Sequence, residues 1–256
     1  MKKTNKILLI VSTILVLCLS LSGCSKDSKE KQNITISAAA SLKEPLEEIK
    51  GVYEKEDDVN ITLNLGASGT LQKQIEQGAD CDIYISASPK QINELEKKNL
   101  IKKDSKIDLL QNKLVIISNK ESNKNLDPND SELKFSIGTP KVVPAGDYAK
   151  ESLENMGMYD KLKDKIIYAK DVKQVLSYVE TNNVDFGMVY KSDALSSDKC
   201  KIYEVVDDNM HKPIIYPAAI VASTKNESQS DKFIKYLNSP KSKEIFKKYG
   251  FECVNN

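Results

Sequence analysis

The chain contains no arginine and no tryptophan, and His211 is its only histidine. Without arginine there is no guanidinium fork for bidentate binding of phosphate or carboxylate, no arginine finger and no arginine-to-guanine contact. The 38 Lys+Arg side chains are therefore all lysines, and they face 37 acidic side chains for a formal net charge of +1. Because nucleic-acid-binding proteins usually carry a strong basic excess, we expect no nucleic-acid partner.

The N-terminal segment has the pattern of an export signal. Three lysines precede an apolar run of 15 residues from Ile7 to Leu21, which is shorter than the roughly 20 residues that a transmembrane helix needs. The run ends in Leu21-Ser22-Gly23-Cys24, which resembles the lipobox of bacterial lipoproteins. In that family the peptide is cut before the cysteine, whose thiol carries a diacylglycerol. The resemblance implies a signal peptide over residues 1–23, a lipid on Cys24 and a polar tether over residues 24–32; an ordinary cleavage site beside an incidental cysteine is the alternative.

Cleavage before Cys24 changes what remains for the fold. It removes Cys18 and three lysines but no acidic residue, which moves the formal charge from +1 to −2. Cys81, Cys200 and Cys253 are then left, and none belongs to a CxxC pair of the kind that binds zinc or does redox chemistry. Since three thiols cannot all pair internally, we expect mainly buried free thiols, with one disulfide among the three as the alternative.

The remaining sequence alternates between strand and helix patterns, which predicts an α/β protein. With 40% hydrophobic and 29% charged residues it has a globular composition. Leu42, Leu46, Ile49 and Tyr53, for example, fall at helical spacing directly after the β-type run 34–38. Strands are predicted at 34–38, 59–65, 82–86, 114–118, 135–138, 166–169, 186–190 and 214–222. Helices are predicted after each of the first three strands, at 145–156, 159–164 and 172–179, and around 233–237 and 245–249.

These strands and helices form two series of about 100 residues each, which suggests two lobes. We expect one lobe to comprise residues 33–112 and 216–256 and the other residues 113–215, each a mostly parallel sheet flanked by helices. The chain should cross between them near its long apolar strands. A two-lobed α/β protein binds its ligand in the cleft between the lobes, outside the carboxyl ends of the strands.

Four strand-to-helix junctions share a run of small or unbranched polar residues. The first N–H groups of a helix lack an internal partner, and the macrodipole adds about half a positive charge there. Several such ends that converge on one point form an anion site without a cationic side chain, so the lack of arginine does not exclude an anionic ligand. The junctions are Ala39-Ala40-Ser41, Gly66-Ala67-Ser68-Gly69-Thr70, Pro144-Ala145-Gly146 and Lys170-Asp171-Val172.

Ser41 and Ser68 have hydroxyls that can accept from a backbone N–H while donating to an oxyanion. Each also has a purely structural alternative. Ser41 and Glu44 have the spacing of a helix capping box. Ser68 lies in a Gly-Ala-Ser-Gly run that is equally typical of a tight turn, and it does not form the GxSxG elbow of hydrolases.

Three further residues at these strand ends and helix starts have simple structural roles. Tyr190 ends the strand pattern 186–190, where packing at the rim of the core is the simpler role, although its phenol is a neutral donor that could reach the cleft. Asp171 is most simply a helix N-cap, with Gln174 at the box position. Pro144 fits the first turn of a helix.

Taken in order, these segments resemble the molybdate-binding protein of ABC importers over residues 33–251. The matching segments are Ala38-Ala39-Ala40-Ser41-Leu42, Gly66-Ala67-Ser68-Gly69-Thr70-Leu71 with Gln74-Ile75, Asp82-Ile83-Tyr84-Ile85-Ser86-Ala87, Val143-Pro144-Ala145-Gly146-Asp147-Tyr148-Ala149, Asp171-Val172, Gly187-Met188-Val189-Tyr190-Lys191-Ser192-Asp193-Ala194 and Ile245-Phe246-Lys247-Lys248-Tyr249-Gly250-Phe251.

The resemblance implies a type II periplasmic-binding-protein fold whose lobes close on molybdate or tungstate. In that family the anion is held by backbone N–H groups and hydroxyls, and no charged side chain touches it. Matched motif by motif, the resemblance implies hydroxyl donors at Ser41, Ser68 and Tyr190 and backbone N–H donors at Ala145 and Val172. These groups would hold the oxygens of the oxyanion, with no direct metal ligation and no cofactor.

We further expect a monomeric receptor rather than an enzyme. It would lie on the extracellular face of the cytoplasmic membrane, anchored through Cys24, and pass its ligand to an ABC permease. Asp147 is expected to face solvent, because an inward carboxylate would repel a dianion and favour a protonated ion such as hydrogen phosphate. A receptor for sulfate or phosphate is the main alternative. A hydrolase that combines Ser41 or Ser68 with His211 and an aspartate is another, although residues 207–212 have the polar composition of a solvated loop.

Overall fold

The computed structural model describes residues 31–254. The predicted signal peptide, the lipid on Cys24 and nearly all of the predicted tether lie outside these residues. The strands and helices described below belong to the compact unit Gln32–Asn256. Among the residues described, none of the helices combines the length and the apolar character needed to span a bilayer.

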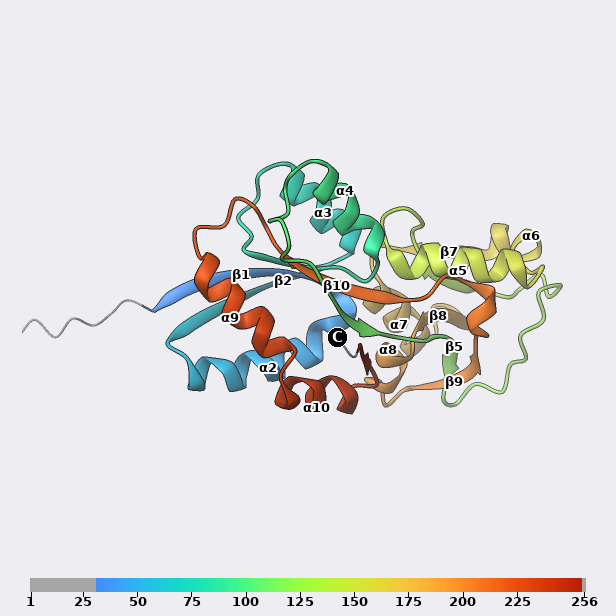
Figure 1. Ribbon diagram of the computed structural model, residues 1–256. Helices are drawn as coiled ribbons and strands as arrows, with labels where there is room; N and C mark the ends of the chain where they lie inside the picture. The colour runs from blue at the N-terminus through green and yellow to red at the C-terminus, as the bar shows by residue number, and fades with distance from the viewer. Residues whose placement is uncertain (1–30, 255–256) are drawn as a thin grey trace, which may run out of the picture. The chain divides into compact units, whose positions relative to one another are not determined.

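The first lobe is built on a six-stranded sheet. Its strands are β1 Gln32–Ala39, β2 Val59–Gly66, β3 Ile83–Ile85, β4 Ile107–Gln111, β10 Ile215–Ile220 and β11 Glu252–Cys253, and its helices are α2 Lys43–Glu56, α3 Ser68–Glu76, α4 Pro89–Lys97, α9 Glu227–Leu237 and α10 Pro240–Lys248. The strand order is β11-β4-β10-β3-β1-β2, and β1 pairs in parallel with both β2 and β3. Figure 1 shows α3 and α4 on one side of this sheet and α2, α9 and α10 on the other.

The second lobe is built on a five-stranded sheet. Its strands are β5 Leu114–Asn119, β6 Phe135–Gly138, β7 Ile166–Ala169, β8 Phe186–Tyr190 and β9 Cys200–Val205, and its helices are α5 Pro144–Asn155, α6 Tyr159–Leu162, α7 Val172–Glu180 and α8 Lys191–Leu195. The strand order is β7-β6-β8-β5-β9. The start of α5 packs directly on the end of β6, since a Cβ on Gly146 would lie 2.0 Å from the Gly138 carbonyl oxygen. This close approach fixes where the N-terminus of α5 points.

All eight predicted strands are present, within two residues at each end. Both sheets are mixed, however, where the sequence predicted mostly parallel sheets. The antiparallel pairings involve β10 with β3 and β4, β11 with β4, and β5 with β8 and β9. These antiparallel pairings arise at the two places where the chain crosses between the lobes, because the strands there run antiparallel to their neighbours. Three strands, β4, β9 and β11, have no counterpart in the prediction, since each is short and mixes apolar with polar residues.

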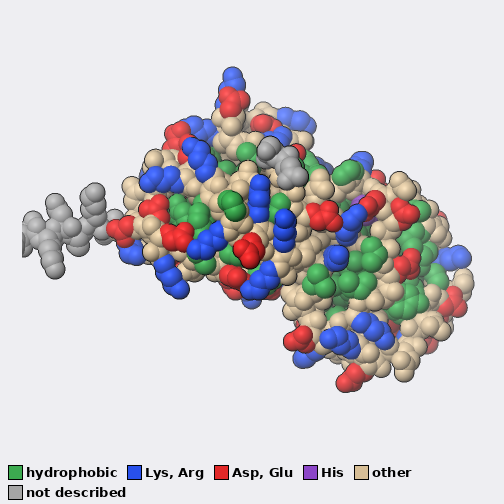
Figure 2. All heavy atoms as spheres, turned by 60° about the horizontal axis from the view of Figure 1, so that its bottom comes forward, with side chains coloured by type: hydrophobic (Ala, Val, Ile, Leu, Met, Phe, Trp, Pro, Cys, Tyr) green, Lys and Arg blue, Asp and Glu red, His purple; other side chains and the backbone are tan. Residues whose placement is uncertain are grey.

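The periodic apolar residues form the core as predicted. Leu46, Ile49 and Tyr53 of α2 are buried against the first sheet, as are Ile34 and Ile36 of β1. The three cysteines of the described residues, at 81, 200 and 253, are free thiols, which confirms that prediction over the disulfide. On the face shown in Figure 2, lysine and acidic side chains are interspersed over the surface, as expected of a solubilising role for the lysines.

Candidate functional site

The four small-residue junctions meet at one small cavity between the lobes. Its lining residues are Ala39, Ala40, Ser41, Gly66, Ala67, Ser68, Ala87, Val143, Pro144, Asp171 and Val172. The cavity volume of about 10 Å³ is enough for about one water molecule. To hold a four-oxygen anion, the walls of the cavity would have to move slightly apart. The sequence prediction that these junctions converge is confirmed.

The wall formed by α5 presents one backbone donor. Pro144 is the first residue of this helix and has no N–H, and the N–H groups of Gly146 and Asp147 both donate to the Val143 carbonyl. The Ala145 N–H is therefore the donor of this first turn that is left for a ligand. Ala145 itself is 1% exposed and is not among the residues that line the cavity, although its neighbour Pro144 is.

The wall formed by α7 has the predicted cap. The Asp171 carboxylate accepts from the Gln174 N–H at 2.8 Å, and the Gln174 amide oxygen in turn accepts from the Lys170 N–H at 2.7 Å. Asp171 lines the cavity, but one of its oxygens is occupied by this cap. The cap fixes the start of the helix and leaves the Val172 N–H at the cavity, as the prediction requires.

Ser68 is completely buried at the start of α3, where its hydroxyl oxygen accepts from the Ala87 N–H at 3.0 Å. Its hydrogen is thus free to point into the cavity. Ala87 brings in a fifth strand-to-helix junction, between β3 and α4, that the sequence analysis did not single out as part of the site. The signal was present, because Ala87 is followed by the N-cap Ser88 and by Pro89 at the helix start.

Ser41 does not form the capping box considered above. It lies inside a 3₁₀ turn over Ala40–Leu42, α2 starts only at Lys43, and no side chain caps either helix. The Ser41 hydroxyl instead lies 3.0 Å from the phenol oxygen of Tyr216 on β10. Glu44, the other half of the expected box, is bonded to Lys173 of the second lobe. The Ser41 hydroxyl is therefore available at the cavity and does not cap the helix.

Tyr190 ends β8 and is 1% exposed. Its ring packs edge-on against Tyr148 and Tyr216, with centroids 6.5 and 5.6 Å away. Tyr190 is not among the residues that line the cavity, yet within the described residues its phenol oxygen has no hydrogen-bond partner. Burial raises the pKa of Tyr190 well above its ordinary value, so the phenol keeps its proton. A buried donor without a partner requires an explanation, and a ligand supplies one.

Of the described residues that line the cavity, none is a lysine. Lys173 follows Val172 directly, but its ammonium lies 2.7 Å from Glu44 and 3.2 Å from Asp193. Burial alone would lower the pKa of Lys173, and the two carboxylates outweigh this and raise it. Burial also raises the pKa of Asp193 to about 6. The Lys173 charge is thus neutralised within this group, and its pair with Glu44 joins the two lobes.

A second contact joins the lobes beside the cavity. The Gly69 N–H donates to the Val142 carbonyl at 2.9 Å. A Cβ on Gly69 would lie 2.5 Å from that oxygen, so only glycine permits the approach. The lobes therefore meet backbone to backbone at this point.

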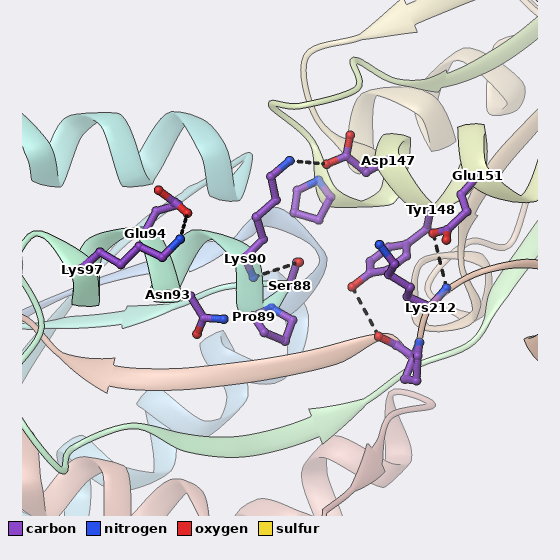
Figure 3. A pocket seen from close by; sticks show the side chains of 12 residues that line it. Ser88, Pro89, Lys90, Asn93, Glu94, Lys97, Asp147, Tyr148, Glu151 and Lys212 are labelled. Carbon is purple, nitrogen blue, oxygen red and sulfur yellow. Dashed lines mark hydrogen bonds and ion pairs between the residues drawn. The ribbon is translucent and has the colours of Figure 1, made fainter.

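A larger groove of about 590 Å³ lies between α4 and α5 and shares Pro144 with the cavity. Figure 3 shows Lys90 reaching across it to Asp147, with 3.3 Å between the charged atoms. Asp147 also accepts from the Lys141 N–H at 2.6 Å and is turned away from the small cavity, as predicted. The groove is far too large to hold a small oxyanion with fixed donors, and its lining mixes lysines with acidic residues. We therefore place the candidate site at the small cavity.

His211 is 7% exposed, which contradicts the expectation of a solvated loop. Its Nδ1 lies 2.8 Å from the Lys212 carbonyl oxygen, and its ring packs against Tyr148. His211 does not line the cavity, and its Nδ1 bonds to a backbone carbonyl where a triad would need a carboxylate. The hydrolase arrangement is therefore not formed. Within residues 31–254 there is also no cluster of three or more His, Cys, Asp or Glu side chains that could hold a metal ion.

The comparisons with known proteins agree with this geometry. A profile of the bacterial extracellular solute-binding protein family matches residues 34–252. The molybdate-binding protein ModA of Haemophilus influenzae is 36% identical over 99% of this chain and 100% of its own length. A Bacillus subtilis protein provisionally named as the ABC transporter substrate-binding lipoprotein YvgL is 45% identical, over 91% of this chain and 93% of that one.

A solved structure supports the fold. The substrate-binding domain of a provisionally assigned molybdenum ABC transporter of Clostridium difficile is 44% identical to this chain. It matches with a TM-score of 0.68 over 87% of this chain and 99% of that one. The two-lobed periplasmic-binding-protein fold is thereby confirmed. The chain belongs to the bacterial extracellular solute-binding protein family, as a ModA-like substrate-binding protein of an ABC transporter.

Proposed function

We propose that the protein captures molybdate or tungstate outside the cytoplasmic membrane and delivers it to an ABC permease. Ser41, Ser68 and Tyr190 donate from their hydroxyls, and Ala145 and Val172 donate from their backbone N–H groups. The dianion is neutralised by helix N-termini and oriented dipoles instead of by lysine. No covalent chemistry and no cofactor is required, and the protein acts as a monomer.

One observation carries this proposal. The cavity is lined by residues of five strand-to-helix junctions, and among the described residues that line it there is no lysine. The Ser68 hydroxyl accepts the Ala87 backbone hydrogen, which leaves its own hydrogen available to a ligand. Such a site matches an anion that carries no hydrogen of its own. Related proteins that bear the name molybdate-binding protein support the choice of ion.

The test is calorimetry on the chain without residues 1–23. Every described strand and helix starts at Gln32 or later, so this truncation removes none of them. Molybdate and tungstate should bind tightly, and sulfate and phosphate much more weakly. Equal affinity for sulfate would overturn the choice of ion, and tight binding of phosphate would point to the alternative receptor. Elemental analysis of the protein as isolated gives an independent readout, because molybdenum and tungsten do not occur in the polypeptide itself.

The proposed location rests on the lipobox-like segment and on the B. subtilis relative, whose name contains the word lipoprotein. We propose that Cys24 carries the lipid and that residues 24–32 act as the tether. Intact-mass spectrometry of the native protein should show a diacylglyceryl group on Cys24. A Cys24→Ser variant should be released from the membrane fraction, and a membrane-bound variant of normal mass would contradict the anchor.

A further inference from the structure

The phenol of Tyr216 lies behind the candidate site and does not line it. Tyr216 is fully buried on β10, and its oxygen is 3.0 Å from the Ser41 hydroxyl. Ser41 itself is 2% exposed, so no bulk water competes for this contact. The two residues are 175 positions apart, and each comes from a different strand or turn of the first lobe. Either oxygen of this buried hydroxyl pair can be the donor until a third group fixes the direction.

The ligand-free pair leaves open which oxygen donates, because each hydroxyl carries one hydrogen and can also accept. A bound oxyanion removes this freedom. An oxyanion oxygen without a hydrogen can only accept, so the Ser41 hydroxyl has to direct its single hydrogen at the ligand.

With the Ser41 hydrogen directed at the ligand, the Tyr216 hydrogen is the one left to join the two oxygens. Burial raises the pKa of Tyr216 well above its ordinary value, so that hydrogen is retained at neutral pH. Ser41 then accepts from Tyr216, and its single hydrogen has to point elsewhere. The cavity, which Ser41 lines, is where that hydrogen can be used.

We propose that Tyr216 is a positioning residue that fixes the Ser41 hydroxyl as a donor to the bound oxyanion. In the bound state the hydrogen bonds run from Tyr216 to Ser41 and from Ser41 to the ligand. The inference rests on the function proposed above and adds a residue that acts only through Ser41.

A double-mutant cycle tests the inference, with sodium molybdate as the probe and calorimetry as the readout. Ser41→Ala should weaken binding by about 10- to 100-fold, as expected for a lost bond to a charged group. Tyr216→Phe should weaken it by about 3- to 10-fold in the wild-type background and by nothing further in the Ser41→Ala background. An equal loss in both backgrounds would mean that Tyr216 acts through packing, and would overturn the inference.

Tyr53→Phe is the matched control. Its buried phenol bonds to Asp57 at 3.0 Å, and it lies on α2 outside the cavity lining. This variant should lower the stability of the fold, as Tyr216→Phe does, without any change in molybdate affinity. A loss of affinity in Tyr53→Phe would show that the measured affinity follows the stability of the fold. The double-mutant cycle would then no longer support the inference.

Failure of the inference on Tyr216 can be distinguished from failure of the proposed function. If the wild type binds sulfate or phosphate in place of molybdate, the same cycle is measured with that ion, and only the choice of ligand fails. If it binds none of them, or if Tyr216→Phe does not fold, the tyrosine Raman doublet of the ligand-free protein decides. The difference between wild type and Ser41→Ala should show one phenol whose hydrogen bonding changes. No change in the doublet would overturn the inference.

Discussion

The contact between Gly69 and Val142 predicts how closely the lobes can approach. Gly69 lies in the first turn of α3, and its N–H donates to the Val142 carbonyl of the other lobe at 2.9 Å. A Cβ on Gly69 would lie 2.5 Å from that oxygen and 3.0 Å from Val142 Cα. Both atoms belong to backbone and cannot rotate away. Gly69→Ala should therefore hinder closure of the lobes around the ligand.

The magnitude follows from two costs. Forcing an extra methyl group against fixed neighbours costs about 1–3 kcal/mol, and a lost backbone hydrogen bond costs about 0.5–1.5 kcal/mol. Together they destabilise the closed form by roughly 2–4 kcal/mol, which is a roughly 30- to 800-fold loss of affinity at 1.4 kcal/mol per factor of ten. With the lobes apart, the methyl group does not meet Val142. Because alanine favours a helix over glycine by about 1 kcal/mol, the ligand-free protein should be as stable as the wild type or more so.

Calorimetry with molybdate measures the affinity, and urea denaturation without ligand measures the free energy of unfolding. Small-angle scattering with and without molybdate reports whether the lobes still close. Gly51→Ala is the matched control, since Gly51 lies within α2 and its Cβ would have no atom within 4 Å. It should raise stability and leave affinity unchanged. An unaltered affinity in Gly69→Ala would refute the role of this contact in the bound state.

Three further outcomes are expected. Tyr190→Phe should weaken molybdate binding by about 10- to 100-fold, because it removes a donor to a charged ligand; calorimetry with unchanged affinity would place Tyr190 outside the site. Since none of the described residues that line the cavity is a lysine, a tenfold rise in NaCl concentration should change that affinity by less than about threefold, and a steep salt dependence in the same titration would indicate a lysine at the ligand. The folded pKa of Asp193, about 6, lies above its ordinary value of 3.8, so the folded protein holds an extra proton between these values. The free energy of unfolding should therefore fall as the pH rises from about 4 to about 6, by on the order of 3 kcal/mol. Urea denaturation across this pH range should show the fall in the wild type and not in Asp193→Asn; the same fall in both proteins would exclude Asp193 as its source.

Much of the fold follows from local pattern. Leu46, Ile49 and Tyr53 recur at helical spacing and form the buried face of α2. Asp171 with Gln174 forms the N-cap that their spacing predicts. Strands and helix ends can be predicted in this way because periodicity and capping depend on residues a few positions apart.

Other features depend on partners far away in the chain. The spacing of Ser41 and Glu44 predicts a cap, yet Ser41 pairs with Tyr216 and Glu44 with Lys173, 129 positions later. His211 has polar neighbours in sequence and is buried all the same, because it packs against Tyr148. No local pattern encodes such contacts, since they form only when the two sheets are assembled.

The sequence by itself predicted an export signal and determined an alternation of strands and helices and a set of helix starts without arginine that suit an anion. Only the tertiary structure decided that these helix starts meet at one cavity, that Lys173 is neutralised beside it, and that Tyr216 stands behind Ser41. The physical reason is one of range. Backbone propensity and capping act over a few residues, whereas the direction of a buried hydroxyl hydrogen is set by every donor and acceptor that folding brings around it.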